Sequence, residues 1–299
     1  MLLLRSLLMM LVVTLPAVLR AQTPDVLKWK FSLQDEFRLE TTTELTQTIR
    51  VKNQAELPPQ AVKHVQVSRY KVKAVEGEGT VLEQQIESIR AESAAGAAPP
   101  PKLFQQLEGT VLKITLSPTF QVVKLEGYEE MLKKVAGDDA TLERSVASLL
   151  PKETLTRSLE ESFAFLPPAG TAAGGTWERK FTAGLGPLGT LNITNVYKLE
   201  GNEAVDGRQT VRVACKPLVT YSKPAGKSAE LPIQITNGNI TVEQAEGNLW
   251  FDPAAGKLVK SEMKMKLKGT LTVQSSGQED VVEIGQELSV KIRMLEAAK

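Results

Sequence analysis

The chain has 299 residues, and its 36 lysines and arginines almost balance its 35 aspartates and glutamates, which leaves a net charge of +1. Because neither sign is concentrated along the sequence, no large basic face is expected for nucleic acid or anionic lipid. One cysteine and one histidine allow no internal disulfide and no Cys/His zinc site, so stability must come from buried apolar surface.

Residues 1–21 carry the pattern of a secretory signal peptide. Arg5 supplies the positive charge, an apolar run covers residues 7–19, and Ala21 offers the small residue needed for cleavage. The run is shorter than the about 20 apolar residues of a membrane-spanning helix. We therefore expect a secreted or periplasmic protein whose mature chain, residues 22–299, has no transmembrane anchor after cleavage.

The first part of the mature chain is rich in strand patterns. Apolar and charged residues alternate from Phe37 to Val51, which predicts a half-buried strand. At about 3.4 Å per residue this strand would approach about 50 Å, a length at which it must coil or bend. Further strand patterns follow at residues 62–75, 81–89, 110–116 and 120–125, the last two as a hairpin.

The period of the apolar residues becomes helical over residues 127–166. Three stripes predict three short amphipathic helices, at Tyr128 to Val135, Leu142 to Leu149 and Leu155 to Phe163. Gly137 is expected to end the first helix, Asp138 or Asp139 to cap the second, and Pro151 to separate the second from the third. The apolar stripes must be buried against a sheet.

Strand patterns return in the last part of the chain. They cover residues 176–183, 188–199, 210–221 and 233–251, and end in a pair at 259–273 and 282–294. In this pair Met263, Met265 and Leu267 share one face, opposite the even-numbered residues of the last strand. Lys264 and Lys266 share the other face.

About ten to twelve strands are more than an open twisted sheet holds without curling or splitting. We therefore predict a mainly β fold, with a large curved antiparallel sheet or partial barrel and the three-helix segment packed on its concave side. A two-sheet sandwich is the competing architecture. Residues 22–299 would form a single β-rich domain, or two lobes at 22–125 and 176–299 joined by the helical segment 126–166.

Short motifs occur in a distinctive order along nearly the whole mature chain. They are Leu27-Lys-Trp-Lys-Phe31, Phe37-Arg-Leu-Glu40, Ile114-Thr-Leu-Ser-Pro118, Val123-Lys-Leu-Glu-Gly127, Phe163-Ala-Phe-Leu-Pro-Pro168, Gly175-Thr-Trp177, Gly247-Asn-Leu-Trp-Phe-Asp252 and Gly256-Lys-Leu-Val259. In this order the chain resembles a secreted bacterial family of unknown function, numbered 6263. The resemblance implies export and a β-rich fold, and it brings no established activity.

Single residues that could carry chemistry have simpler structural explanations. His64 lies in a charged stretch at the start of a strand and is expected to be exposed. Cys215 continues the apolar face of Val211 and Val213, which predicts a buried cysteine and not a reactive thiol. The segment Gly184-Leu-Gly-Pro-Leu-Gly189 has the glycine spacing of a dinucleotide-binding fingerprint. A strand pattern follows where that fingerprint requires a helix, so a hairpin turn is expected.

Carboxylates and tryptophans also have structural explanations. The pairs Glu129-Glu130, Asp138-Asp139 and Glu160-Glu161 are predicted to be solvated helix faces or caps, because neighbours in a helix do not face each other as a glycosidase pair must. Trp29, Trp177 and Trp250 could form a platform for sugar. Each lies at or near a strand pattern, so core packing, or a rim position with the indole N–H satisfied, is expected. The sequence therefore assigns no catalytic, metal-binding or cofactor-binding residue.

Three classes of function stay open. The first is a non-catalytic envelope protein that binds an apolar or amphipathic, lipid-like small molecule in the concavity of the curved sheet. Its cavity or lid residues would be Leu142, Val146, Leu149, Leu155, Leu159 and Phe163. The second is a structural protein, or one that binds another envelope protein, with a filled core. The third is a carboxylate-based hydrolase, which rests only on the abundance of acids.

Export is expected to remove the segment through about Ala21, because the charge, the apolar run and the small residue together meet the requirements of signal peptidase. Mass measurement of the protein isolated from the envelope fraction of its host should give a chain that starts near Gln22. A mature protein that retains Met1 would contradict this prediction.

Overall fold

The computed structural model describes residues 27–52, 58–77, 79–93, 103–184, 189–224, 233–275 and 278–296. The expected signal peptide, residues 1–21, lies outside the described residues.

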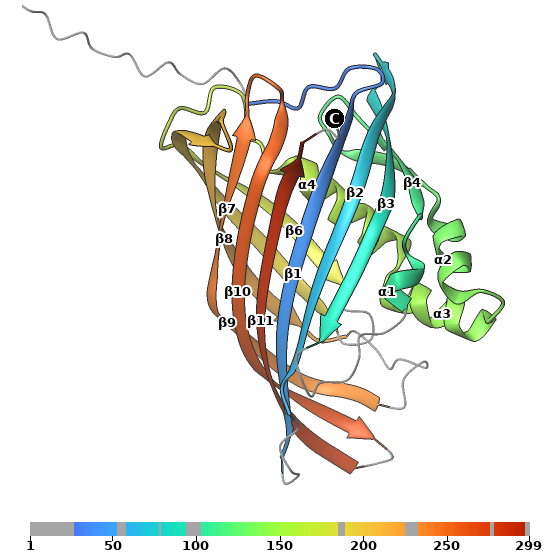
Figure 1. The fold of residues 1–299 in the computed structure, drawn as a ribbon. Coiled ribbons are helices and arrows are strands. Elements are labelled where there is room, and N and C mark those ends of the chain that lie inside the picture. Colours follow the sequence, from blue (N-terminus) through green and yellow to red (C-terminus); the bar gives the residue numbers. More distant parts are fainter. Residues whose placement is uncertain are drawn as a thin grey trace, which may run out of the picture.

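One antiparallel sheet of eleven strands makes up most of the fold (Figure 1). In chain order the strands are β1 (Glu36–Val51), β2 (Gln60–Glu76), β3 (Gly79–Ser93), β4 (Val111–Leu116), β5 (Val122–Glu126), β6 (Thr176–Gly184), β7 (Thr190–Val205), β8 (Arg208–Ser222), β9 (Ile233–Asp252), β10 (Lys257–Ser275) and β11 (Gln278–Leu295). Their order across the sheet is β5-β4-β3-β2-β1-β11-β10-β9-β8-β7-β6. The pairing of β1 with β11 joins the front and back halves of the chain into this one sheet.

The sheet is strongly curved and does not close, since β5 and β6 are its two edges (Figure 1). Long strands with the natural right-handed twist coil in this way because neighbouring strands rotate relative to each other. The predicted mainly β fold with a large curved antiparallel sheet or partial barrel is therefore confirmed, and the structure shows that the sheet does not close. The sandwich alternative is wrong, because one sheet bends around its own core.

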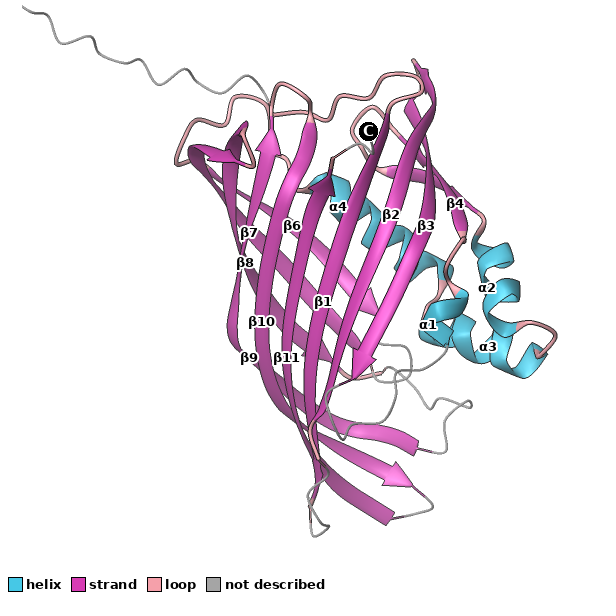
Figure 2. Ribbon diagram, viewed as in Figure 1, coloured by secondary structure: helices cyan, strands magenta, loops and turns pink. Residues whose placement is uncertain are grey.

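Four helices accompany the sheet in the described part of the chain (Figure 2). They are α1 (Leu103–Gln106), α2 (Tyr128–Ala136), α3 (Ala140–Leu149) and α4 (Lys152–Ala164). The predicted boundaries are confirmed: Gly137 ends α2 with a positive φ of 60°, and Pro151 precedes α4. The Asp139 carboxylate caps α3 by accepting from the Thr141 and Leu142 amides at 2.9 and 3.0 Å.

The three longer helices take two different places. Helix α4 contacts both edge strands, β5 and β6, and runs behind the front strands in Figures 1 and 2. It therefore occupies the open side of the curved sheet, where Leu155, Leu159 and Phe163 pack against the main core. Helices α2 and α3 lie beside β4 and build a second, smaller core around residues such as Met131 and Val146.

The C-terminal end of α4 is held by three side chains from distant parts of the chain. The indole N–H of Trp29 donates to the Phe163 carbonyl at 2.9 Å, and that of Trp177 donates to the Phe165 carbonyl at 3.2 Å. The Arg179 guanidinium donates to the Ala164 carbonyl at 3.1 Å. The last carbonyls of a helix have no partner within the helix. These donors therefore fix the helix end, and the expected burial and pairing of Trp29 and Trp177 is confirmed.

Trp29 belongs to residues 27–35, the N-terminal strap, which crosses one end of the curved sheet before β1 begins (Figure 1). The strap is attached to the β9–β10 turn, where the Lys30 amide donates to the Gly256 carbonyl at 3.1 Å. A Cβ at position 256 would lie 2.5 Å from the Lys30 backbone nitrogen, and φ is +64°, so only glycine fits. The strap closes this end of the sheet over the main core.

The hydrogen bond from Trp29 can be tested against a matched tryptophan. Trp250 is also buried, but its indole N–H has no hydrogen-bond partner in the described structure. Trp29→Phe should lower the free energy of unfolding by about 1–2 kcal/mol more than Trp250→Phe, because only the first leaves a buried carbonyl unpaired. Urea unfolding of both variants measures the difference. Equal losses would show that the helix-end bond contributes nothing.

Candidate functional site

The concave face of the sheet is built by alternate residues of β1, β10 and β11. Met265 lies opposite Leu288, and Met263 lies opposite Val290, which confirms the predicted register of the last strand pair. Met263 packs against the main core together with Phe163 of α4, so this is the inner face. The lysines at the alternating positions of β10 face the other side.

The apolar side chains of the concave face are only partly covered away from α4. Leu267 is buried, whereas Met265, Ile284, Leu288 and Val290 keep part of their surface accessible. Described pairing between β8 and β9 stops at Cys215 and Gly247, and the strands spread apart toward the lower end in Figure 1. The strap thus covers one end of the concave face, and beyond it the apolar side chains of β10 and β11 keep part of their surface accessible.

A small cavity of about 120 Å³ lies at the strap end, between the last turn of α4, the strap and the sheet. We call it the aromatic chamber, because six of its lining residues are aromatic: Trp29, Phe37, Tyr70, Phe163, Phe165 and Tyr197. Leu39, Leu249, Leu258 and Ile292 complete its apolar lining. A concave, mainly apolar cavity with a few polar groups is the usual form of a small-molecule site.

Glu161 is the charged residue among those that line the aromatic chamber. Its Oε2 atom is buried and has no hydrogen-bond partner in the described structure. Burial, with a contribution from the Glu160 carboxylate, raises the pKa of Glu161 to about 7, although the Arg179 guanidinium acts in the opposite direction. The expectation that this acid is a solvated helix residue is therefore wrong, because segments distant in sequence enclose it.

The other acid pairs behave as expected. Glu129 is exposed and forms an ion pair with Lys152 at 2.9 Å, and Asp139 is the α3 cap described above. Sequence reasoning missed Glu161 because its neighbours in the chain are ordinary helix residues. The only available signal was its position two residues before Phe163, at the end of an apolar helix stripe.

An outer pocket of about 560 Å³ adjoins the aromatic chamber, and the two share Glu161 and Phe163. Its charged residues also include Lys28, Arg179 and Lys180, with Glu160 as a second acid. Glu161 thus lies between a small aromatic cavity and a larger, more polar one.

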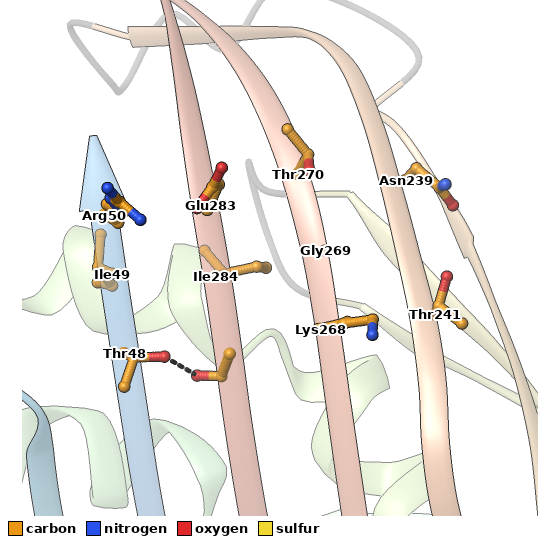
Figure 3. A pocket seen from close by; sticks show the side chains of 11 residues that line it. Thr48, Ile49, Arg50, Asn239, Thr241, Lys268, Gly269, Thr270, Glu283 and Ile284 are labelled. Carbon is orange, nitrogen blue, oxygen red and sulfur yellow. Dashed lines mark hydrogen bonds between the residues drawn. The ribbon is translucent and has the colours of Figure 1, made fainter. Parts of the chain in front are cut away.

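A further depression of about 470 Å³ lies on the opposite face of β1, β9, β10 and β11 (Figure 3). Arg50 and Glu283 face each other across the β1–β11 ladder, and Lys268 continues the lysine-bearing face of β10. The helices lie behind the strands in this view. These are ordinary cross-strand neighbours of a solvated sheet face, and we do not assign the depression to the binding surface.

The six residues expected to line a cavity or lid fall into two groups. On α4, Phe163 lines the aromatic chamber, and Leu155 and Leu159 pack against the main core. On α3, Val146 belongs to the second core and Leu142 is 36% exposed. The side chain of Leu149 lies outside the described part. The structure therefore places Phe163 at the chamber, Leu155 and Leu159 against the main core, and Val146 in the second core.

The remaining residues singled out in the sequence have structural positions. Cys215 is 4% exposed within the main core, and burial raises its pKa to about 12, so the prediction of a buried thiol is confirmed. Gly184 ends β6 and the antiparallel strand β7 follows from Thr190, so a strand stands where the nucleotide fingerprint requires a helix, and residues 185–188 lie outside the described part. His64 lies within β2, partly buried and not exposed as expected, and burial lowers its pKa.

Trp250 is buried as expected but its indole N–H is unpaired in the described structure, and the Lys260 ammonium lies 4.7 Å from its ring centroid. Among the described residues, no group of three or more His, Cys, Asp or Glu side chains could hold a metal ion. None of the described helices is long and apolar enough to span a membrane.

The fold and cavities define a mainly β protein with one open, curved antiparallel sheet and an apolar concave face. Residues 64–213 match the model of a family of unknown function, DUF6263, and the chain belongs to that family, as the sequence motifs predicted. No curated protein matches the chain in sequence.

Several solved structures show a distant likeness. A lipovitellin structure described by its lipid–protein interactions is 12% identical with a TM-score of 0.45, over 90% of this chain and 26% of that chain. The present chain thus spans about a quarter of that protein. A putative outer membrane lipoprotein-sorting protein domain from Vibrio parahaemolyticus is 11% identical with a TM-score of 0.18, over 87% of each chain. These likenesses are too distant to carry an argument about function.

The partly buried carboxyl of Glu161 predicts a specific dependence of stability on pH. Its pKa is about 7 in the folded protein and has an ordinary value of 4.5. Between these values the unfolded chain has released a proton that the folded protein keeps, so stability falls as pH rises through this window. Above pH 7 the wild-type protein should be about 1–2 kcal/mol less stable than Glu161→Gln. This range is smaller than the full pKa shift implies, because the Glu161 side chain is partly exposed and water screens its charge.

Urea unfolding of both proteins between pH 4.5 and pH 8.5 measures this difference. Glu178→Gln, an exposed position on neighbouring β6, is the matched control and should differ from wild type by less than about 0.5 kcal/mol throughout. A constant difference between wild type and Glu161→Gln across this range would contradict the burial of the carboxyl.

Proposed function

We propose that this protein is a non-catalytic binding protein of the bacterial cell envelope, which holds an apolar or amphipathic molecule on the concave face of its sheet. The observation that carries the proposal is the row of partly exposed apolar side chains on β10 and β11, including Met265 and Leu288, which leads to the aromatic chamber. Covering such surface is worth roughly 25 cal/mol per Å². A lipid-like chain is the ligand that this surface would stabilise best.

The distribution of the core supports this proposal over a filled structural core. Main-core residues gather where the strap and α4 meet the sheet, whereas the apolar row continues past them with only partial burial. A purely structural sheet would be expected to bury such a row, because exposed apolar surface costs free energy without a compensating gain. A protein partner on this face is the alternative occupant, and it is an outcome of the experiment below.

The hydrolase alternative is less well supported by the geometry. Glu160 and Glu161 are adjacent in α4, and adjacent residues of a helix point in different directions. A carboxylate pair for glycoside hydrolysis must flank the scissile bond from two sides. We therefore assign Glu161 a binding role and not a catalytic one.

Helix α4 is proposed to control access to the chamber. Leu155, Leu159 and Phe163 attach it to the core, and it fills the space between the edge strands β5 and β6. The helix could shift without breaking strand pairing, because the two edges make no ladder with each other in the described sheet. Export by the signal peptide, residues 1–21, would place this site in the periplasm or outside the cell.

Binding of the neutral fluorophore N-phenyl-1-naphthylamine tests the proposal. Wild-type protein should bind it with enhanced fluorescence, and Met265→Lys should weaken binding about tenfold or more by placing a charge on the apolar row. Lys266→Ala, the next residue on the opposite face, is the matched control and should bind as wild type does.

Thermal unfolding of both variants establishes that they are folded. Native mass spectrometry of protein purified from its own host should in addition show a small-molecule adduct. Absence of fluorophore binding by the wild type, or equal binding by Met265→Lys, would refute the concave site. A stoichiometric protein partner in place of an adduct would favour the alternative occupant.

A further inference from the structure

Resting on the proposed function, we infer that the aromatic chamber receives the cationic head of an amphiphile, an alkylammonium group, while the hydrocarbon chain lies along the concave face. The aromatic walls of the chamber, the charge of Glu161 and the volume of the cavity point to this class of ligand.

The walls favour a cation. Aromatic rings from the strap, β1, β2, the end of α4 and β7 surround the chamber. Phe37 and Tyr70 stack with their centroids 5.0 Å apart, and Trp29 meets Phe163 edge-on at 5.4 Å. Ring faces attract ammonium groups, and cages of several rings are the usual way in which proteins bind methylated ammonium.

The same end of the molecule already holds a cation against aromatic rings. The Lys257 ammonium lies 4.7 Å from the Phe31 centroid and 5.7 Å from that of Phe37. Its charge is partly balanced by Asp35 of the strap, at 3.7 Å. The chamber itself has Glu161 as its charged lining residue, so a bound cation would meet a negative charge there.

The hydrogen-bonding groups of the chamber point to the same class. The indole N–H of Trp29 and the hydroxyl of Ser162 both donate to carbonyls of α4, and the Tyr197 hydroxyl accepts from the Asn195 amide at 3.1 Å. Glu161 Oε2 is the buried acceptor without a partner in the described structure. An ammonium group in the chamber would be attracted by the Glu161 carboxylate, whereas a carboxylate or phosphate head would be repelled by it.

The size and connection of the chamber suit a head group. Its volume of about 120 Å³ is comparable to the about 150 Å³ of an engineered cavity that holds benzene. A trimethylammonium or primary ammonium group therefore fits, but a long chain does not. Ile292 lines the chamber, and Val290 and Leu288 follow on the same face of β11, which gives the chain a continuous apolar path.

The charge of Glu161 makes binding depend on pH. The groups that act on this carboxyl are Glu160 on α4 and Arg179 on β6, with Tyr197 on the neighbouring strand β7. Because the pKa of Glu161 is about 7, the carboxylate forms mainly above neutral pH. Affinity for an alkylammonium ligand is therefore expected to rise between pH 5.5 and pH 8, while affinity for a neutral ligand of the same chain length stays constant.

Displacement of N-phenyl-1-naphthylamine by three ten-carbon ligands tests the inference, using decyltrimethylammonium, 1-decanol and decanoate below their micelle-forming concentrations. At pH 8 wild-type protein should bind decyltrimethylammonium about tenfold or more tightly than 1-decanol, and decanoate most weakly. Glu161→Gln should remove most of this preference. Glu178→Gln is the matched control and should keep the preference. Tyr70→Leu should reduce it with Glu161 intact.

The possible outcomes separate this inference from the proposed function. Equal affinities for the three ligands in the wild type would overturn the cationic head group and leave the concave site standing. Tightest binding of decanoate would also overturn it, and would assign head-group selection to the lysines and arginine of the outer pocket. Failure of the fluorophore and all three ligands to bind would refute the proposed function itself.

Discussion

The rest of the structure depends on how the C-terminal end of α4 is held. A sheet of eleven strands that does not close has two bare edges, and α4 contacts both of them. Its last carbonyls would be unpaired in the protein interior, and Trp29, Trp177 and Arg179 donate to this end of the helix. These bonds tie the strap, an edge strand and the helix together, so the open side of the sheet is occupied by a helix and not by a twelfth strand.

This arrangement makes the two ends of the concavity different. At the strap end, aromatic and aliphatic side chains form a continuous core that includes Phe251, which is fully buried. At the far end the strands spread and their inner apolar residues stay partly accessible (Figure 1). Close packing is thus confined to the end that fixes the fold, and the other end keeps the apolar surface on which a ligand could lie.

Glu161 lowers the stability of the fold, although the proposed function requires its carboxylate. A carboxyl with a raised pKa and an unpaired buried oxygen costs folding free energy above neutral pH. Proteins commonly break local rules of this kind at functional sites and compensate elsewhere. In this chain the compensation would come from the aromatic core next to it, where Trp29 contacts Phe163, Phe165 and Phe251.

The sequence by itself determined the features that local chemistry controls. Alternation in β10 and β11 predicted their register and inner face, and Gly137, the pair Asp138-Asp139 and Pro151 predicted the helix boundaries, because these signals act within one turn or one strand pair. Only the tertiary structure decided that α4 fills the gap between the edge strands and that Glu161 is enclosed. Trp29 and Phe163 are 134 residues apart. Burial of a helix residue depends on which distant segments close over it, and no local pattern encodes that choice.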